Sequence, residues 1–367
     1  MQRLKPRKMQ AVKAGFDLPG SAGRVKRRTW RIWPCAGVAL LAMNFVAAQT
    51  PPAGPAPLAA PSSAEARGIN DWLMRMHEAS KKQAYIGTYV VSSGGSISSG
   101  KIWHVCEGNQ QVERVETLTG APRSIFRHND RVVTFMPEHK VVRTEKRESL
   151  GLFPELLQST DNRIAEFYKV RQEGVERVAG LEADIVVLVP KDAMRFGYRV
   201  WTEQKNGMVV KLQTLDADGK VLEQAAFSEL QLDAPVKMDK LLSMMGKVDG
   251  YKIEKPVLVK TTASAEGWVL KTPVAGFAPM SCYKRPAVAS AAPGADEPLQ
   301  WIFSDGLASV SLFVEPYDRQ RHEKEASMSL GATQTMTKQV GSYWLTVMGE
   351  VPMKTIKMFA GGLERKK

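Results

Sequence analysis

Alternating apolar and polar residues dominate the chain from residue 85 to residue 230 and predict a large antiparallel sheet. The clearest segment is 198–230, in which Asn206-Gly207 and Asp218-Gly219 separate three runs rich in β-branched or aromatic residues. Asn-Gly and Asp-Gly readily adopt the positive φ angles of tight hairpins, so this segment is predicted to be a three-stranded meander. Both of its faces carry apolar side chains, and both are therefore expected to contact other apolar groups.

Further strands are predicted before the meander, where turn-forming residues recur at short intervals. They are expected at 85–91, 101–107, 111–117, 123–128, 131–136, 140–144, 164–171 and 181–189. The apolar segment 150–158 is predicted to become helical after Pro154. A single sheet with this many strands must twist and curl, which gives it a concave face.

Besides the segment after Pro154, three longer helices are predicted. In 69–84, apolar residues recur at i, i+3, i+4 and i+7, so this helix is expected to pack on the sheet and to cover its concave face. The segment 234–248 is predicted to be a second helix because it carries Met238, Leu241, Leu242, Met244 and Met245. Pro352 stands where a third helix, 353–363, would begin.

The residues after 262 are predicted to form a second, smaller α+β domain. Its strands are expected at 267–271, 300–303, 308–314, 334–340 and 343–349, with a turn at 273–279 and a variable loop at 285–298. The predicted fold class is therefore α+β, with a large domain at 69–235, a helix and linker at 236–262, and a small domain at 263–363.

The basic charge of the chain is concentrated at its N-terminus. The formal net charge is +13, and residues 1–48 carry ten Lys or Arg against the single acid Asp17. An apolar run at 32–48 follows these charges and ends in small residues, which predicts an export signal cut after Ala48. A membrane anchor is the alternative, but the run is short and contains Pro34 and Asn44. The charge therefore gives no argument for nucleic-acid binding, and the Pro/Ala-rich residues 49–68 are predicted to be a disordered linker.

Two cysteines, Cys106 and Cys282, remain after the predicted signal is removed. An even number of cysteines in an exported protein is consistent with a disulfide. Two separate buried thiols are an equally good interpretation, because the sequence does not give the distance between them.

No catalytic or cofactor motif stands out. The loop from Gly95 to Lys101 has the spacing of a phosphate-binding loop, but Ile102 follows the lysine where a hydroxyl residue would be needed. None of the five histidines pairs with another at metal-ligand spacing, and no Ser/His/Asp arrangement is apparent. A binding protein without metal or cofactor is therefore favoured over an enzyme, although an exported enzyme with an unrecognised site stays open.

Five segments stand in order over nearly all of the chain after the predicted signal and linker: 122–137 (PRSIFRHNDRVVTFMP), 198–227 (YRVWTE…KLQTLDADGKVLEQAAF), 276–285 (GFAPMSCYKR), 301–314 (WIFSDGLASVSLFV) and 347–354 (VMGEVPMK). Together they resemble the RseB/MucB family of periplasmic negative regulators of the sigma-E (AlgU-type) envelope-stress response. The resemblance implies a large domain like LolA and LolB, which is a half-open barrel with a helical lid. It also implies a periplasmic location.

The resemblance further implies that the small domain, with the linker, holds the periplasmic segment of an RseA/MucA-type anti-sigma factor and hides it from the site-1 protease. Envelope lipid, lipopolysaccharide in particular, would loosen this complex. A homodimer is left open. The alternative function is that of a lipoprotein or lipid carrier of the LolA/LolB type.

The residues expected to carry these contacts are apolar, and each could equally belong to the core. The predicted lining of the lipid cavity is Trp103, Phe126, Phe135, Leu152, Phe153, Leu156 and Trp201. The predicted contacts with the anti-sigma factor are Trp301, Phe303, Phe313 and Trp344.

Overall fold

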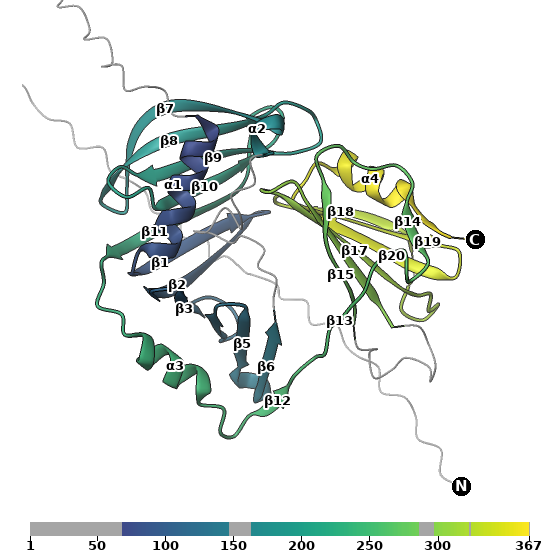
Figure 1. Cartoon of the computed structure of the whole chain (residues 1–367), viewed down its shortest axis with the longest axis horizontal. Coiled ribbons are helices and arrows are strands. Elements are labelled where there is room, and N and C mark those ends of the chain that lie inside the picture. The colour runs from purple at the N-terminus through teal and green to yellow at the C-terminus, as the bar shows by residue number, and fades with distance from the viewer. Residues whose placement is uncertain (1–67, 147–162, 286–296, 323, 367) are drawn as a thin grey trace, which may run out of the picture. The chain divides into compact units, whose positions relative to one another are not determined.

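A computed structural model describes residues 68–146, 163–285, 297–322 and 324–366 (Figure 1). The predicted export signal, the predicted helix at 150–158 and the cavity residues Leu152, Phe153 and Leu156 lie outside these ranges. Within them, no helix has the length and apolar character needed to cross a membrane.

Twelve strands of the described chain form one large sheet, which twists and curls along its length (Figure 1). In sheet order they are β12 (Lys252–Glu254), β6 (Val141–Lys146), β5 (Arg131–Met136), β4 (Ser124–His128), β3 (Gln110–Thr117), β2 (Ser96–Glu107), β1 (Tyr85–Ser93), β11 (Val221–Leu232), β10 (Val209–Leu215), β9 (Gly197–Glu203), β8 (Leu181–Pro190) and β7 (Tyr168–Val178). All neighbours are antiparallel except β12 and β6. The predicted meander is confirmed as β9–β11, with Gly207 and Gly219 at positive φ in its two turns.

Two helices pack on opposite faces of this sheet. Ala79 of α1 (Ile69–Lys82) packs with Ile102 of β2, whereas Met238 of α3 (Met238–Gly246) packs with Val105 of the same strand. Residues 102 and 105 point to opposite faces because side chains alternate along a strand. Both helices were predicted and both are confirmed, but each covers a different part of the sheet.

The predicted strand at 164–171 is wrong in its first half. Residues 164–167 form the short helix α2 (Ile164–Phe167), and β7 begins only at Tyr168. Ile164 and Tyr168 are both buried against the apolar side of α1, where Trp72, Leu73 and Met76 lie. Buried residues occur in short helices as well as in strands, and a run this short does not distinguish the two. A single 3-10 turn, η1 (Pro137–His139), joins β5 to β6.

A second sheet of seven strands is formed by the C-terminal residues, which confirms the α+β class. In sheet order its strands are β13 (Val259–Lys260), β15 (Ala278–Lys284), β16 (Leu299–Ser304), β17 (Ser309–Pro316), β20 (Tyr343–Gly349), β19 (Thr333–Val340) and β18 (Ala326–Leu330). A separate pair joins β14 (Trp268–Leu270) to β21 (Leu363–Arg365). The strands β15, β18 and β21 were not predicted, and the predicted linker contributes β12 to the large sheet and β13 to the small one.

The core of the small sheet lies on one of its faces, beneath α4 (Met353–Gly362). Ile356 and Phe359 of this helix are fully buried against Leu312 of β17 and Val347 of β20. Pro352 occupies the N-cap position, as its fixed φ angle predicted.

Candidate functional site

A pocket of about 610 Å³ opens beside the small sheet, where β14, β15 and β16 meet the segment that follows β13. We call it the Trp301 pocket. Its lining residues are Lys260, Thr261, Thr262, Ala263, Ser264, Trp268, Val269, Leu270, Pro273, Phe277, Pro279, Met280, Ser281, Cys282, Trp301, Phe303 and Lys366. Most of this lining is apolar or aromatic, which is typical of a binding site for an apolar group.

Trp301 and Phe303 share one wall of the pocket because they are two residues apart on β16 and point to the same face. Their ring centroids are 4.6 Å apart. Phe303 is buried and also contacts Phe359 of α4 at 5.0 Å, so it belongs to the core. Trp301 is only half-buried, and it is therefore the member of the pair that can contact an incoming group.

The lining also contains polar and basic residues. Lys260 and Lys366 are exposed, and the Lys366 ammonium contacts the hydroxyl of Ser264. Thr261 and Thr262 belong to the same lining, and the hydroxyl of Thr261 donates a 2.8 Å hydrogen bond to Glu266. Among the described residues, the two charged side chains of the lining are both basic.

Phe313 and Trp344 lie on the other face of the small sheet. Phe313 is next in sequence to Leu312, which pairs with Trp301, so Phe313 and Trp301 point to opposite faces. Trp344 is buried and stacks on His322, with ring centroids 4.9 Å apart. His322 in turn lies 3.1 Å from a carboxylate oxygen of Glu315. The four predicted anti-sigma contacts therefore do not form one surface.

Three of the predicted lipid-cavity residues come together beneath α3. Phe126 and Phe135 are in edge-to-face contact with centroids 5.6 Å apart, and both pack with Met245 of the helix. Trp103 lies close to Phe126, because the guanidinium of Arg114 contacts both rings. It lies 4.8 Å from the ring of Trp103 and 5.6 Å from the ring of Phe126. These side chains pack between the sheet and α3.

Trp201 does not join that group. It belongs to the cluster that contains Ala79 of α1 and Tyr85 of β1. Its indole N–H donates a 2.5 Å hydrogen bond to Glu176, and the ammonium of Lys211 lies 4.0 Å above its ring. The structure thus places Trp201 away from the helix that covers Phe126 and Phe135.

A buried charged cluster that the sequence did not indicate joins the two sheets. Arg195, in the loop between β8 and β9, donates from Nε to Asp305 at 2.8 Å and from a terminal nitrogen to the carbonyl of Ala275 at 2.8 Å. Asp305 lies in the turn between β16 and β17, and the hydroxyl of Tyr168 donates to the same carboxylate at 3.2 Å. Burial raises the pKa of Tyr168 well above its ordinary value, so this phenol stays a donor.

Aromatic rings complete the surroundings of Arg195. The guanidinium lies 4.3 Å from the ring of Phe167 and 5.1 Å from that of Phe277. Asp192 forms a second ion pair with it. Strands on both sides of Asp305, at 300–303 and 308–314, were predicted from the sequence, but nothing in the local pattern indicated that this aspartate would bind an arginine from the large sheet.

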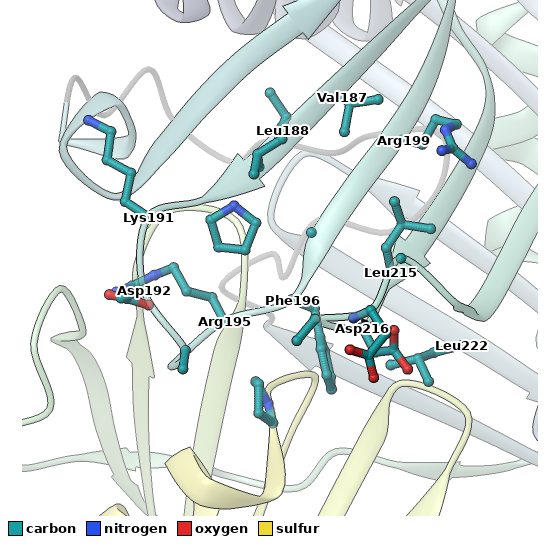
Figure 2. A pocket seen from close by; sticks show the side chains of 18 of the residues that line it. Val187, Leu188, Lys191, Asp192, Arg195, Phe196, Arg199, Leu215, Asp216 and Leu222 are labelled. Atoms are coloured by element: carbon teal, nitrogen blue, oxygen red, sulfur yellow. Dashed lines mark hydrogen bonds and ion pairs between the residues drawn. The ribbon is translucent and has the colours of Figure 1, made fainter. Parts of the chain in front are cut away.

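A second pocket, of about 800 Å³, lies beside this cluster (Figure 2). Figure 2 shows Lys191, Asp192, Arg195 and Arg199 among its lining residues, together with Phe196 and Leu222. Met353 of α4 and Gln334 of β19 complete it from the small sheet. Acidic and basic groups both line this pocket, so its charge does not favour one class of ligand.

Both remaining cysteines are free thiols, so the disulfide considered from the sequence is not formed. Cys106 lies on β2 of the large sheet, whereas Cys282 lies on β15 of the small sheet and lines the Trp301 pocket. Burial raises the pKa of the Cys282 thiol to about 11, with a smaller contribution from Glu266. Among the described residues, no group of three or more His, Cys, Asp or Glu could hold a metal ion.

Comparison with known proteins gives matches across both sheets. Residues 68–245 match the MucB/RseB N-terminal domain, and residues 262–364 match the MucB/RseB C-terminal domain. The sigma factor AlgU regulatory protein MucB of Pseudomonas aeruginosa is 28% identical over 316 residues, which cover 83% of this chain and 93% of the relative. The sigma-E factor regulatory protein RseB of Haemophilus influenzae is 24% identical over 308 residues, covering 81% and 91%.

A solved structure is similar over the same span. It is described as the complex structure of Pseudomonas aeruginosa MucA/MucB, and its matching chain has 26% sequence identity and a TM-score of 0.63. The match covers 81% of this chain and 99% of that chain. The similarity therefore includes both sheets and not the large sheet alone.

Proposed function

Because this chain belongs to the MucB/RseB family, we propose that it is a periplasmic regulator that binds the periplasmic segment of a MucA/RseA-type anti-sigma factor. The observation that carries this proposal is the match to both family domains in order, from residue 68 to residue 364. The similar solved structure is a complex of MucB with MucA, which supports the same kind of partner for this chain.

The partner segment is proposed to bind at the Trp301 pocket. Trp301 is the half-buried aromatic residue of the β16 pair, and Met280, 41% exposed, lies in the same lining. Aromatic side chains of this kind contribute most of the binding energy at interfaces when a partner desolvates them. Phe303 supports Trp301 from the core and is not itself proposed to be the contact surface.

Binding is proposed to keep the anti-sigma segment from its site-1 protease. A protease needs an extended, accessible substrate backbone, and a segment held against the small sheet does not offer one. This regulator therefore needs no catalytic group of its own.

An acyl chain of envelope lipid, such as that of lipopolysaccharide, is proposed to reverse the binding by entering beneath α3. Each methylene transferred from water is worth about 0.8 kcal/mol, so a dozen could supply roughly 10 kcal/mol before ordering costs. That exceeds the roughly 8 kcal/mol of a micromolar protein contact. The chain would replace the contacts that Met238 and Met245 make with the sheet near Trp103, Phe126 and Phe135.

The test is a pull-down of the mature protein with the periplasmic segment of a MucA/RseA-type anti-sigma factor. Retention of the segment, its protection from site-1 protease and its release by lipopolysaccharide are the expected results. If no segment is retained while the protein carries lipid between vesicles, the alternative function of a lipid carrier is correct instead.

A further inference from the structure

Arg195, in the loop between β8 and β9, reaches the turn that precedes β15 of the small sheet. One of its terminal nitrogens donates a 2.8 Å hydrogen bond to the carbonyl of Ala275, while its Nε donates to Asp305, also at 2.8 Å. Its guanidinium lies 5.1 Å from the ring of Phe277. Because the side chain of Arg195 is fully buried, these contacts fix both the backbone of the turn and the aromatic ring that follows it.

Phe277 also lines the Trp301 pocket. Its ring lies 5.7 Å from that of Phe359, which in turn lies 5.0 Å from the ring of Phe303. Phe303 contacts Trp301 at 4.6 Å. Protein interiors are close-packed, so a shift of Phe277 would change the shape of the pocket. Arg195 is not part of the lining, and its effect on the pocket is therefore indirect.

Gly276 lets the turn approach Arg195 closely. It has a φ angle of +82°, and a Cβ at this position would overlap a terminal nitrogen of Arg195 and lie 2.9 Å from the ring of Phe167. A residue with a side chain would therefore push the guanidinium away from the turn. Gly276 does not line the pocket either, so a substitution there displaces Arg195 and leaves every lining residue in place.

The first turn of α4 holds the residue next to Arg195. The hydroxyl of Thr355 donates a 2.7 Å hydrogen bond to the carbonyl of Met194, and Thr355 is fully buried. Thr355 and Phe359 are four positions apart and share one face of the helix. The helix α4 thus contacts both the Arg195 loop and the aromatic rings that lead to Trp301.

From these contacts we propose that Arg195 is a positioning residue of the Trp301 pocket, which has its binding shape only while the loop 191–196 is docked on the small sheet. The proposal rests on the proposed function, because the occupant of the pocket is the partner segment. Coupling between two sites is reciprocal. Withdrawal of Arg195 weakens partner binding, and a bound partner in turn strengthens the docking of the loop.

The experiment measures how tightly the mature protein binds a labelled periplasmic segment of a MucA/RseA-type anti-sigma factor. Gly276→Ala is the test variant. Gly267→Ala is the matched control, because Gly267 has a φ angle of +77° and also directly precedes an aromatic lining residue, Trp268. A Cβ at Gly267 would lie 3.9 Å from Arg365, which is an ordinary contact. Gly276→Ala is expected to weaken binding about tenfold, and Gly267→Ala by less than about twofold.

The thiol of Cys282 supplies a measurement that needs no partner, because it lines the same pocket. In a Cys106→Ser background, alkylation of Cys282 is expected to be about fivefold faster with Gly276→Ala than with Gly267→Ala, since release of the turn opens the pocket. Met245→Ala is a second control. Met245 is buried beneath α3 on the large sheet, so its loss lowers stability without touching the Arg195 contacts.

A second variant removes the guanidinium itself. Arg195→Met with Asp305→Asn eliminates both charges of the buried pair, and the asparagine oxygen can still accept from the backbone N–H groups of Leu307 and Ala308, as Asp305 does. Replacing both members of a buried pair costs much less stability than removing one. This variant is expected to stay folded, which circular dichroism checks, and to show the same weaker binding and faster alkylation.

Hydrogen exchange tests the coupling from the other side. The residues 191–196 do not line the Trp301 pocket, yet the bound partner segment is expected to slow the exchange of their backbone amides about fivefold. Unchanged exchange in the complex would contradict the reciprocal coupling and overturn the inference.

The outcomes separate this inference from the proposed function. If Gly276→Ala and the double variant match Gly267→Ala in affinity and in alkylation rate, the inference is wrong and the proposed function stands. If Met245→Ala speeds alkylation as much, lost stability explains the effect and the inference is again wrong. If the unaltered protein retains no anti-sigma segment, the proposed function fails. Faster alkylation with Gly276→Ala would then still support the role of Arg195, and equal rates would overturn it.

Discussion

The guanidinium of Arg195 and the carboxylate of Asp305 meet at 2.8 Å with both side chains fully buried. The two residues are 110 positions apart and belong to connections of different sheets. A buried pair of this kind adds little net stability compared with an apolar contact, but removing one partner leaves a charge that water cannot reach. The pair therefore specifies how the loop after β8 meets the turn after β16.

The first prediction concerns this pair. Asp305→Ala is expected to lower the free energy of unfolding by about 3–5 kcal/mol, because Arg195 would stay buried with only part of its charge compensated. Urea denaturation measures the change. The control is Glu78→Gln, which removes an exposed pair with Lys82 on α1 and should cost about 0.5 kcal/mol at most. Equal losses for the two variants would show that the buried pair has no special role.

The second prediction compares two turn glycines with the same backbone conformation. Gly331 and Gly341 have φ angles of +58° and +59°. A methyl group at Gly331 would overlap the hydroxyl of Ser93, the last residue of β1 before its turn into β2, whereas nothing lies within 4 Å of one at Gly341. Gly341→Ala should cost about 1–2 kcal/mol of backbone strain, and Gly331→Ala should cost more. Identical urea midpoints would mean that the two turns do not press on each other.

The third prediction concerns α3. Met245 is 5% exposed against Phe126 and Phe135, so Met245→Ala should cost about 2–5 kcal/mol, measured by urea denaturation. Because α3 would then be held less firmly, less lipid should be needed to release the partner segment. Met74→Ala is the control, since Met74 is 47% exposed on α1. A change in stability without a change in the lipid requirement would contradict lipid entry beneath α3.

The fourth prediction concerns the thiols. Mass spectrometry of non-reduced peptides should find Cys106 and Cys282 unlinked. Because burial raises the pKa of Cys282 to about 11, its alkylation rate in a Cys106→Ser variant should rise about tenfold per pH unit up to that value. The folded state binds this proton more tightly than the unfolded state, so stability should fall as pH rises from about 8.5 toward 11. A plateau in the alkylation rate near pH 8.5, or a linked peptide, would contradict the structure.

Much of the secondary structure could be predicted because its causes are local. Asn206-Gly207 and Asp218-Gly219 determine the turns of the β9–β11 meander through backbone sterics alone. Pro352 similarly marks the start of α4. The predictions failed where neighbouring residues carried little information, since residues 164–167 fit a strand or a helix equally well. The strand β18 was not predicted either, although apolar residues alternate with serines along its five residues, all of which are exposed.

The candidate contact residues also depend partly on local pattern, which the sequence shows, and partly on packing, which it does not show. Alternation along β16 and β17 places Trp301 and Phe313 on opposite faces once their pairing is known. The sequence alone does not say which face α4 covers, and that choice makes Phe303 a core residue and leaves Trp301 half-buried.

By itself the sequence determined the class of the protein, most of its strands and helices, and the family it resembles, because short-range sterics and periodicity act within a few residues. Only the tertiary structure decided that Phe126 and Phe135 lie beneath α3, that Lys260 and Lys366 share one pocket, and that Arg195 reaches Asp305. Such contacts depend on how sheets curl and which faces helices cover. Those are properties of the packed chain as a whole, and no local pattern encodes them.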